Sequence, residues 1–211
     1  EHYSFFSENS AQILGDRSGF AFFAARRTRI HGGSAVFFFS KRQEEITRAV
    51  NLWDSNSQED WSLDSGFSDK AREVRTLGDW EQFSRMAKDT MAQVKDKTEA
   101  AISKGRRIVA VGAAAKAITF LRAASVPIHH LLDESLDKVG RFVDGLNVSI
   151  EALGDFNYEP GDYYLVTAWN FAPELMAKIR AAGASLDSEA LVYFPSIRET
   201  QLSEFLVPHR S

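Results

Sequence analysis

Short apolar runs alternate with stretches of helical spacing along the second half of the chain. Runs of four to six apolar residues have the length of buried strands, and the segments between them place apolar side chains three and four positions apart. The predicted strands are residues 107–111, 128–132, 163–168 and 191–194, with a polar turn after the second, and the predicted helices are residues 113–124 and 171–182. Strands that alternate with helices form a parallel sheet. The pattern therefore predicts an α/β fold, a Rossmann-like parallel sheet with flanking helices.

A longer helical stripe precedes this alternation. From Asp79, apolar residues recur at spacings of three and four over a helix of about 25 residues that ends at Lys104-Gly105. We expect the stripe to face the core or another lobe rather than a partner protein. Its members are Trp80, Phe83, Ala87, Met91, Val94, Thr98 and Ala101.

The first forty residues have a different pattern. Ser7 is a candidate cap for a helix that ends at Gly15, and apolar residues 20–24 and 35–39 flank a Gly-Gly turn, as in a β-hairpin. Residues 41–77 are the least regular part of the chain. We therefore predict an N-terminal hairpin and helical segment over 1–40, a connector over 41–77 and the Rossmann-like domain over 78–211.

Composition excludes several classes of protein. The chain is 44% hydrophobic and 26% charged, which is ordinary for a globular domain, and its net charge of -4 argues against a general electrostatic grip on nucleic acid. The absence of Cys excludes a disulfide scaffold and a thiolate metal site. No apolar run approaches the ~18 residues of a membrane span. We expect a cytoplasmic protein with no metal, no nucleic acid and no membrane as partner.

The first chemical signal is the junction between residues 107–111 and the next helix. Gly112 breaks the strand, and Lys116 stands in the first turn of the helix. The amino end of a helix attracts anions, and a lysine there adds a full charge. Phosphate groups of a nucleotide fit this arrangement. The spacing matches neither G-x-G-x-x-G nor a P-loop, so Gly112 also fits a purely structural turn.

Two further segments begin where predicted strands end. Residues 133–141 follow the second strand, and Trp169-Asn170 follow the third. Ligands of parallel α/β sheets bind beyond the carboxyl ends of the strands. The three segments together predict one ligand site at that edge.

These segments together resemble the C-terminal domain of SAM-dependent sugar C-methyltransferases. The resemblance also covers the beginning of the chain and omits about 41–77. It is carried by Glu1-His2-Tyr3, His31-Gly32-Gly33-Ser34, Gly112-Ala113-Ala114-Ala115-Lys116, Asp133-Glu134-Ser135, Lys138-Val139-Gly140-Arg141, Ala168-Trp169-Asn170-Phe171 and Glu174-Leu175-Met176.

The resemblance implies a three-part enzyme: a cysteine-rich zinc lobe, a SAM-binding Rossmann domain and this domain. The substrate that it implies is a nucleotide-linked keto-deoxysugar, usually carried on dTDP. The chain begins without Met, inside what reads as folded sequence, so we expect a fragment or the mature part of a longer product. S-adenosylmethionine is then the cofactor of an upstream domain, and the resemblance makes residues 1–40, with the Glu-His segment and the His-Gly-Gly-Ser hairpin, the tail end of that SAM-binding domain.

The same resemblance assigns the reaction to the Glu-His pair. It makes His2 the base that removes the proton beside the ketone, with Glu1 as its partner, and imidazole suits this work near neutral pH. The alternative is that two terminal residues are inert. His31 either faces the cleft between domains, as the resemblance implies, or only bonds the backbone of its turn.

Substrate binding is assigned to the three carboxyl-end segments. Lys116 and Arg141 are the candidates for phosphate, and Arg141 has the alternative of pairing with Asp133 or Asp137. Trp169 either stacks on a base or sugar or belongs to the core. Asn170 either contacts the ligand or caps the next helix.

Two other functions remain open from the sequence. One is a non-catalytic nucleotide-sugar-binding or assembly module without its own SAM site. The other is a generic dinucleotide-binding domain, for which Asp133 is the only acidic candidate at the required distance. A homodimer and a partner domain are both compatible with the pattern.

Overall fold

The computed structural model describes residues 6–28, 34–41 and 76–205. The chain divides into two compact units, Glu1–Leu77 and Gly78–Ser211. The assignment of functional domains to these ranges stays a prediction.

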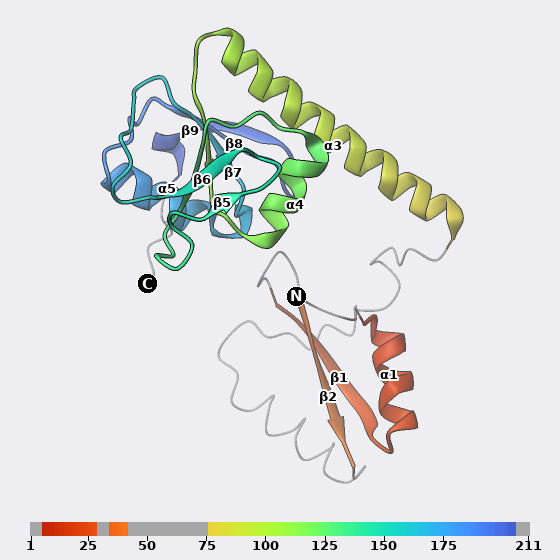
Figure 1. The fold of residues 1–211 in the computed structure, drawn as a ribbon. Coiled ribbons are helices and arrows are strands. Elements are labelled where there is room, and N and C mark those ends of the chain that lie inside the picture. The colour runs from red at the N-terminus through yellow and green to blue at the C-terminus, as the bar shows by residue number, and fades with distance from the viewer. Residues whose placement is uncertain (1–5, 29–33, 42–75, 206–211) are drawn as a thin grey trace. The chain divides into compact units, whose positions relative to one another are not determined.

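The described part of the first unit is a helix and a hairpin (Figure 1). Helix α1 (Glu8–Arg17) begins at a capping box in which Ser7 and Ser10 satisfy each other's backbone amides. Strands β1 (Ala21–Thr28) and β2 (Ser34–Ser40) pair antiparallel, which confirms the hairpin. The helix runs to Arg17, so the end predicted at Gly15 is wrong; Gly15 instead allows close packing, since a Cβ there would lie 2.5 Å from the ring of Phe39.

The second unit contains a seven-stranded sheet in the order β5-β6-β4-β3-β7-β8-β9. The five central strands are parallel, and both edge strands pair antiparallel with their neighbours. The strands are β3 (Ile108–Val111), β4 (His130–Asp133), β5 (Phe142–Val143), β6 (Val148–Ala152), β7 (Tyr163–Val166), β8 (Glu189–Val192) and β9 (Arg198–Gln201). Numbered along the chain, the parallel strands stand in the order 3-2-1-4-5, as in a doubly wound fold. The predicted α/β class is confirmed.

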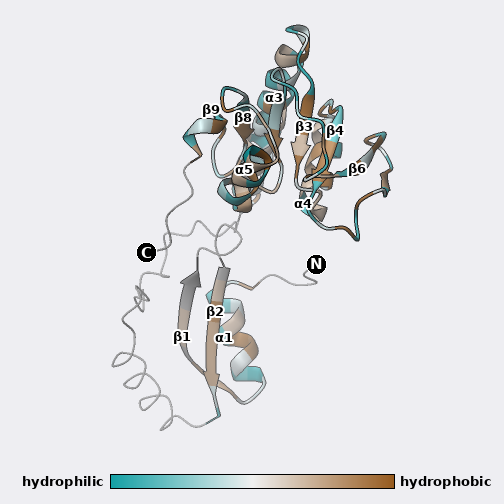
Figure 2. Ribbon diagram, turned by 90° about the vertical axis from the view of Figure 1, so that its left-hand side faces the viewer, coloured by the Kyte–Doolittle hydropathy of each residue, from teal (hydrophilic) through white to brown (hydrophobic). Residues whose placement is uncertain are grey.

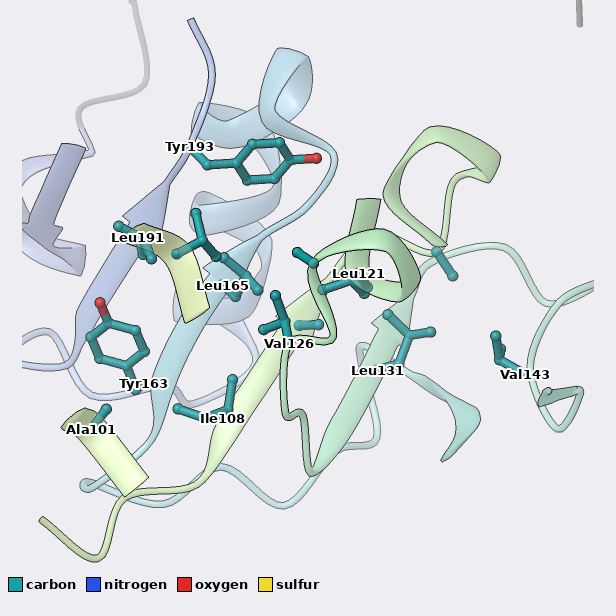
Figure 3. Packing of buried hydrophobic residues seen from close by; sticks show 14 of the residues in the cluster. Ala101, Ile108, Leu121, Val126, Leu131, Val143, Tyr163, Leu165, Leu191 and Tyr193 are labelled. Carbon is teal, nitrogen blue, oxygen red and sulfur yellow. The ribbon is translucent and has the colours of Figure 1, made fainter. Parts of the chain in front are cut away.

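Helices cover both faces of this sheet. Helices α3 (Leu77–Ser103) and α4 (Ala115–Ala124) pack on one face, where Leu121 belongs to the same buried cluster as Ile108, Leu131 and Leu165 (Figure 3). Helix α5 (Ala172–Ala181) packs on the other face with the short 3-10 turns η3 (Trp169–Phe171) and η4 (Leu202–Glu204).

The central strands are apolar along their whole length, because side chains that alternate in direction enter a helix layer on either side. All four residues of β3 are buried, and Figure 2 shows the hydrophobic colours gathered on β3 and β4. Among the described residues, no helix has the length and apolar character that crossing a membrane requires.

The polar turn predicted between the second and third strands is wrong. The segment contains β5 and β6, and β6 is the third parallel strand of the sheet. Only Ile150 of β6 is buried, because β6 lies one strand from the edge and is covered less completely than β3. Strand β9 is also absent from the prediction, since its residues are all polar.

The apolar stripe of α3 divides into two halves. Met91, Val94 and Ala101 pack against the sheet, which confirms the core prediction for this half. Trp80 and Phe83 are each 58% exposed and contact one another edge to face. Figure 1 shows this end of α3, in yellow, extending beyond the sheet of its unit.

Ion pairs fasten the amino-terminal edge of the sheet. Asp162, fully buried before β7, accepts from Nε and Nη2 of Arg107 at 2.7 and 3.0 Å. The hydrogen bond to Asp162 raises the pKa of Arg107, against the lowering effect of burial. Arg106 forms a second pair with Glu189. Because these charges are paired with each other, we assign this edge a structural role.

Candidate functional site

The opposite, carboxyl-terminal edge of the sheet is where the strand order reverses. The chain runs outward from β3 to β4 and β6, then returns to β7 on the other side of β3. The loops that leave β3 and β7 therefore run in opposite directions, and doubly wound folds bind their ligands at such a switch point. The three segments singled out from the sequence follow β3, β4 and β7, which are neighbours in the sheet. The fold thus brings their first residues to one edge.

Gly112, between β3 and α4, packs tightly against Ala168, which follows β7. Its φ is +104°, and a Cβ would lie 2.4 Å from Cβ of Ala168. The hydroxyl of Thr167 lies 2.9 Å from the carbonyl oxygen of Val111 and 2.7 Å from that of Gly112. Only glycine fits this position, and the ends of β3 and β7 are held together at the switch point.

Asp133, the last residue of β4, hydrogen-bonds Ala113, the residue that follows Gly112. Its Oδ2 accepts from the amide of Ala113 at 2.7 Å and from the ammonium of Lys138 at 3.0 Å. Its Oδ1 accepts from the amide of Ser135 at 2.9 Å. The carboxylate is nearly buried. The sequence suggested Arg141 as an ion-pair partner for Asp133; the structure gives that place to Lys138.

Helix α4 presents an open amino end two residues after this turn. Its N-cap is Ala114, whose side chain makes no capping hydrogen bond. The first amides of a helix have no acceptor within the helix, and no described residue supplies one to Lys116 or its neighbours. The side chain of Lys116 is exposed and forms no ion pair or hydrogen bond within the described part of the chain. This is an arrangement suited to an anion.

Aromatic side chains stand at the exits of β7 and β8. Trp169 is half-buried, contacts the core on both faces of the sheet, and lies 4.4 Å from the ring of Phe194, which is 44% exposed. Tyr193 is buried, stacks on Phe120 of α4 at 4.0 Å, and donates to the carbonyl oxygen of Thr167 at 3.3 Å. Sequence analysis placed Tyr193 and Phe194 inside a strand. Their position at the end of that predicted strand was the sequence signal that they lie at the carboxyl-terminal edge of the sheet.

Asn170 and Arg141 are both exposed. Asn170 lies in η3, and the N-cap of α5 is Phe171, so the alternative of Asn170 as the cap is wrong by one position. Arg141 directly precedes β5, and β6 and β4 separate that strand from β3. Within the described ranges Arg141 forms no ion pair with Asp133 or Asp137. Its phosphate role stays a prediction.

The remaining candidates fall outside the described residues. His2, Glu1 and His31 belong to ranges 1–5 and 29–33, so their proposed roles stay predictions. In the part of the chain that is described, no group of three His, Cys, Asp or Glu side chains is arranged to hold a metal. His129 accepts from the amide of Ile108 at 2.9 Å, and His130 bonds Glu151 at 2.7 Å.

Comparison with known proteins gives a consistent result. The family described as the C-methyltransferase C-terminal domain matches residues 29–195. C-methyltransferase NovU of Streptomyces niveus is 25% identical over 181 residues, which cover 83% of this chain. The chain spans about 40% of the length of that relative.

Proposed function

Because the chain belongs to the C-methyltransferase C-terminal domain family, we propose that it binds the nucleotide-linked keto-sugar substrate of a methyltransferase that uses S-adenosylmethionine. The ligand is a sugar carried on a nucleoside diphosphate of the dTDP type. The observation that carries this proposal is the uncapped amino end of α4 at the switch point of the sheet, with Lys116 in its first turn and no partner for that lysine among the described residues.

A diphosphate matches the charges at this edge of the sheet. Its oxygens take the amides of the first turn of α4, which have no acceptor among the described residues, and Lys116 supplies a full positive charge close to them. Gly112 brings the turn against β7. Arg141, exposed at the sheet edge, is the proposed second cation.

Trp169 and Phe194 suit the base of the nucleotide. Flat aromatic faces bind bases by stacking and tolerate any base, at about 1–3 kcal/mol each. The exposed ring of Phe194 contacts the ring of Trp169, close to the carboxyl end of β7. Asn170, the residue after Trp169 in η3, is the proposed hydrogen-bonding partner of the ligand at the same edge.

The chemical step is assigned to residues at the start of the chain. The resemblance makes His2 the base that removes a proton from the carbon beside the ketone, with Glu1 as its partner, and makes His31 a further candidate for the sugar; all three lie outside the described residues. S-adenosylmethionine supplies the methyl group from another domain of the enzyme. The described residues do not fit that cofactor, since Lys116 repels its positively charged sulfonium and Asp133 is occupied.

Calorimetric titration of the chain with dTDP, UDP, GDP and S-adenosylmethionine tests the proposal. We expect one nucleoside diphosphate to bind and S-adenosylmethionine not to bind. Lys116→Ala removes a charge-assisted contact, so the affinity falls by about 1.5–3 kcal/mol, roughly 10- to 150-fold.

Lys104→Ala is the matched control. Lys104 is an exposed lysine at the opposite edge of the sheet, between α3 and β3, so its loss changes the net charge equally without touching the site. Equal affinities for the wild type and Lys116→Ala, or no binding of any nucleoside diphosphate, contradict the proposal.

A further inference from the structure

The loop after β4 has a fixed conformation that places one more lysine at the site. The amide of Lys138 donates to the carbonyl oxygen of Ser135 at 2.9 Å, and that of Gly140 donates to the carbonyl oxygen of Ile150 in β6 at 2.8 Å. The loop is therefore tied both to itself and to the neighbouring strand. This backbone holds Lys138 beside Asp133.

The ammonium of Lys138 and the amide of Ala113, the residue after Gly112, both donate to the same oxygen atom. Oδ2 of Asp133 is 3.0 Å from Nζ of Lys138 and 2.7 Å from the amide nitrogen of Ala113. Each nitrogen lies 3.0 Å or less from the same atom, so the two are within about 6 Å of each other. The ammonium thus stands next to the residue that follows Gly112, at the entrance to α4.

The ammonium group retains donors for a ligand. A lysine ammonium has three donors, and Lys138 uses one of them on Asp133 among the described residues. Its side chain is 39% exposed, whereas that of Asp133 is 9% exposed. The cation therefore faces solvent, and the carboxylate that holds it does not.

Asp133 itself is not available to a ligand. In dinucleotide-binding folds, an acidic residue about 20 positions after the glycine turn accepts the hydroxyls of the ribose. Asp133 has that place in the chain, but its two oxygens already accept from Ala113, Ser135 and Lys138. In those folds the acidic residue binds a sugar hydroxyl; here Asp133 binds the ammonium group of Lys138 instead.

We infer that Lys138 is a further phosphate-binding residue of the nucleotide-sugar site, and that Asp133 is the positioning residue that holds its ammonium group there. The inference rests on the proposed function, since both concern the same diphosphate. It adds Lys138, beside the glycine turn, to the cations already proposed, Lys116 and Arg141. It also assigns this corner of the site to phosphate rather than to the ribose of a dinucleotide.

Titration of the chain with dTDP at low and at physiological salt tests the role of Lys138. Lys138→Met should weaken binding at least tenfold and make the affinity less dependent on salt, because one cation is lost. Lys138→Arg keeps the charge and should retain the affinity within about threefold. Lys104→Met, the same substitution at the opposite edge, should leave it within about twofold. An unchanged affinity in Lys138→Met overturns the inference.

Asp133→Asn separates positioning from electrostatics. Removal of a negative charge beside a phosphate site favours dTDP, so tighter binding means that Asp133 acts only as a repelling charge and overturns its positioning role. Positioning instead predicts weaker binding, and no further loss when Asp133→Asn is added to Lys138→Met. Circular dichroism and the melting temperature verify that each variant is folded.

The outcomes also separate the two proposals. If the wild type binds no nucleoside diphosphate, the proposed function fails. If the wild type binds dTDP and Lys116→Ala weakens binding while Lys138→Met does not, only the inference about Lys138 fails.

Discussion

Single residues at the carboxyl-terminal edge differ in how far their sequence context reveals their role. Lys116 is recognisable from its neighbours, because a lysine just after a strand–glycine junction falls in the first turn of a helix. The role of Lys138 cannot be recognised in this way. Its position depends on Asp133, five residues away, and Asp133 is itself bonded to the amide of Ala113, which follows a different strand, β3. Phe194, which follows β8, likewise contacts Trp169 in the turn after the neighbouring strand β7.

Gly112→Ala tests the contact between the exits of β3 and β7. The variant combines a left-handed backbone, which costs about 1–2 kcal/mol, with a clash against Ala168, which costs about 1–3 kcal/mol. We expect the free energy of unfolding, measured with urea, to fall by about 2–5 kcal/mol. Gly105→Ala is the control, since its φ is +77° and nothing lies within 4 Å of the added carbon. Equal losses in the two variants contradict the packing argument.

At the scale of elements, the strands most difficult to predict are those at the sheet edges. Strands buried on both faces are apolar throughout, as β3 is, whereas β6 buries one residue fully and β9 buries none. Strand β9 is instead held by polar contacts. Glu199 of β9 accepts from Lys97 of α3 at 2.6 Å and from the hydroxyl of Tyr163 of β7 at 2.6 Å.

Glu199→Gln tests whether these contacts hold β9 in a pH-dependent way. Burial raises the pKa of Glu199, but the hydrogen bonds from Lys97 and Tyr163 outweigh it, and the pKa lies below its ordinary value. A lowered pKa stabilises the fold above the unfolded-state pKa of about 4.3, and this is lost as the pH falls through the folded-state value.

Urea unfolding of the wild type and Glu199→Gln at pH 7, and at steps from pH 5 to pH 3, measures this effect. We expect the wild type to be more stable at pH 7 and the difference to shrink on acidification. Tyr163→Phe, which leaves the Lys97 contact in place, should show a smaller change of the same sign. A difference that is independent of pH contradicts the role of Glu199.

On the scale of the whole molecule, all described candidate residues belong to the unit Gly78–Ser211. A ligand stabilises the unit that binds it by about 2.7 kcal/mol at a concentration of 100 times Kd. With dTDP, which lacks the sugar, we expect slower hydrogen exchange at residues 112–118 and 133–140. Residues 6–28 and 34–41 should change less, and equal protection of both units contradicts the assignment of the diphosphate to this sheet.

The sequence by itself determined the α/β class, the central buried strands and the glycine–lysine junction, because these depend on local periodicity and on the backbone freedom of one residue. It also carried the resemblance to the family that the comparison then matched over residues 29–195. The tertiary structure decided the strand order, the place of β6 and the partners of Asp133. These depend on contacts between residues distant along the chain, which no local pattern encodes.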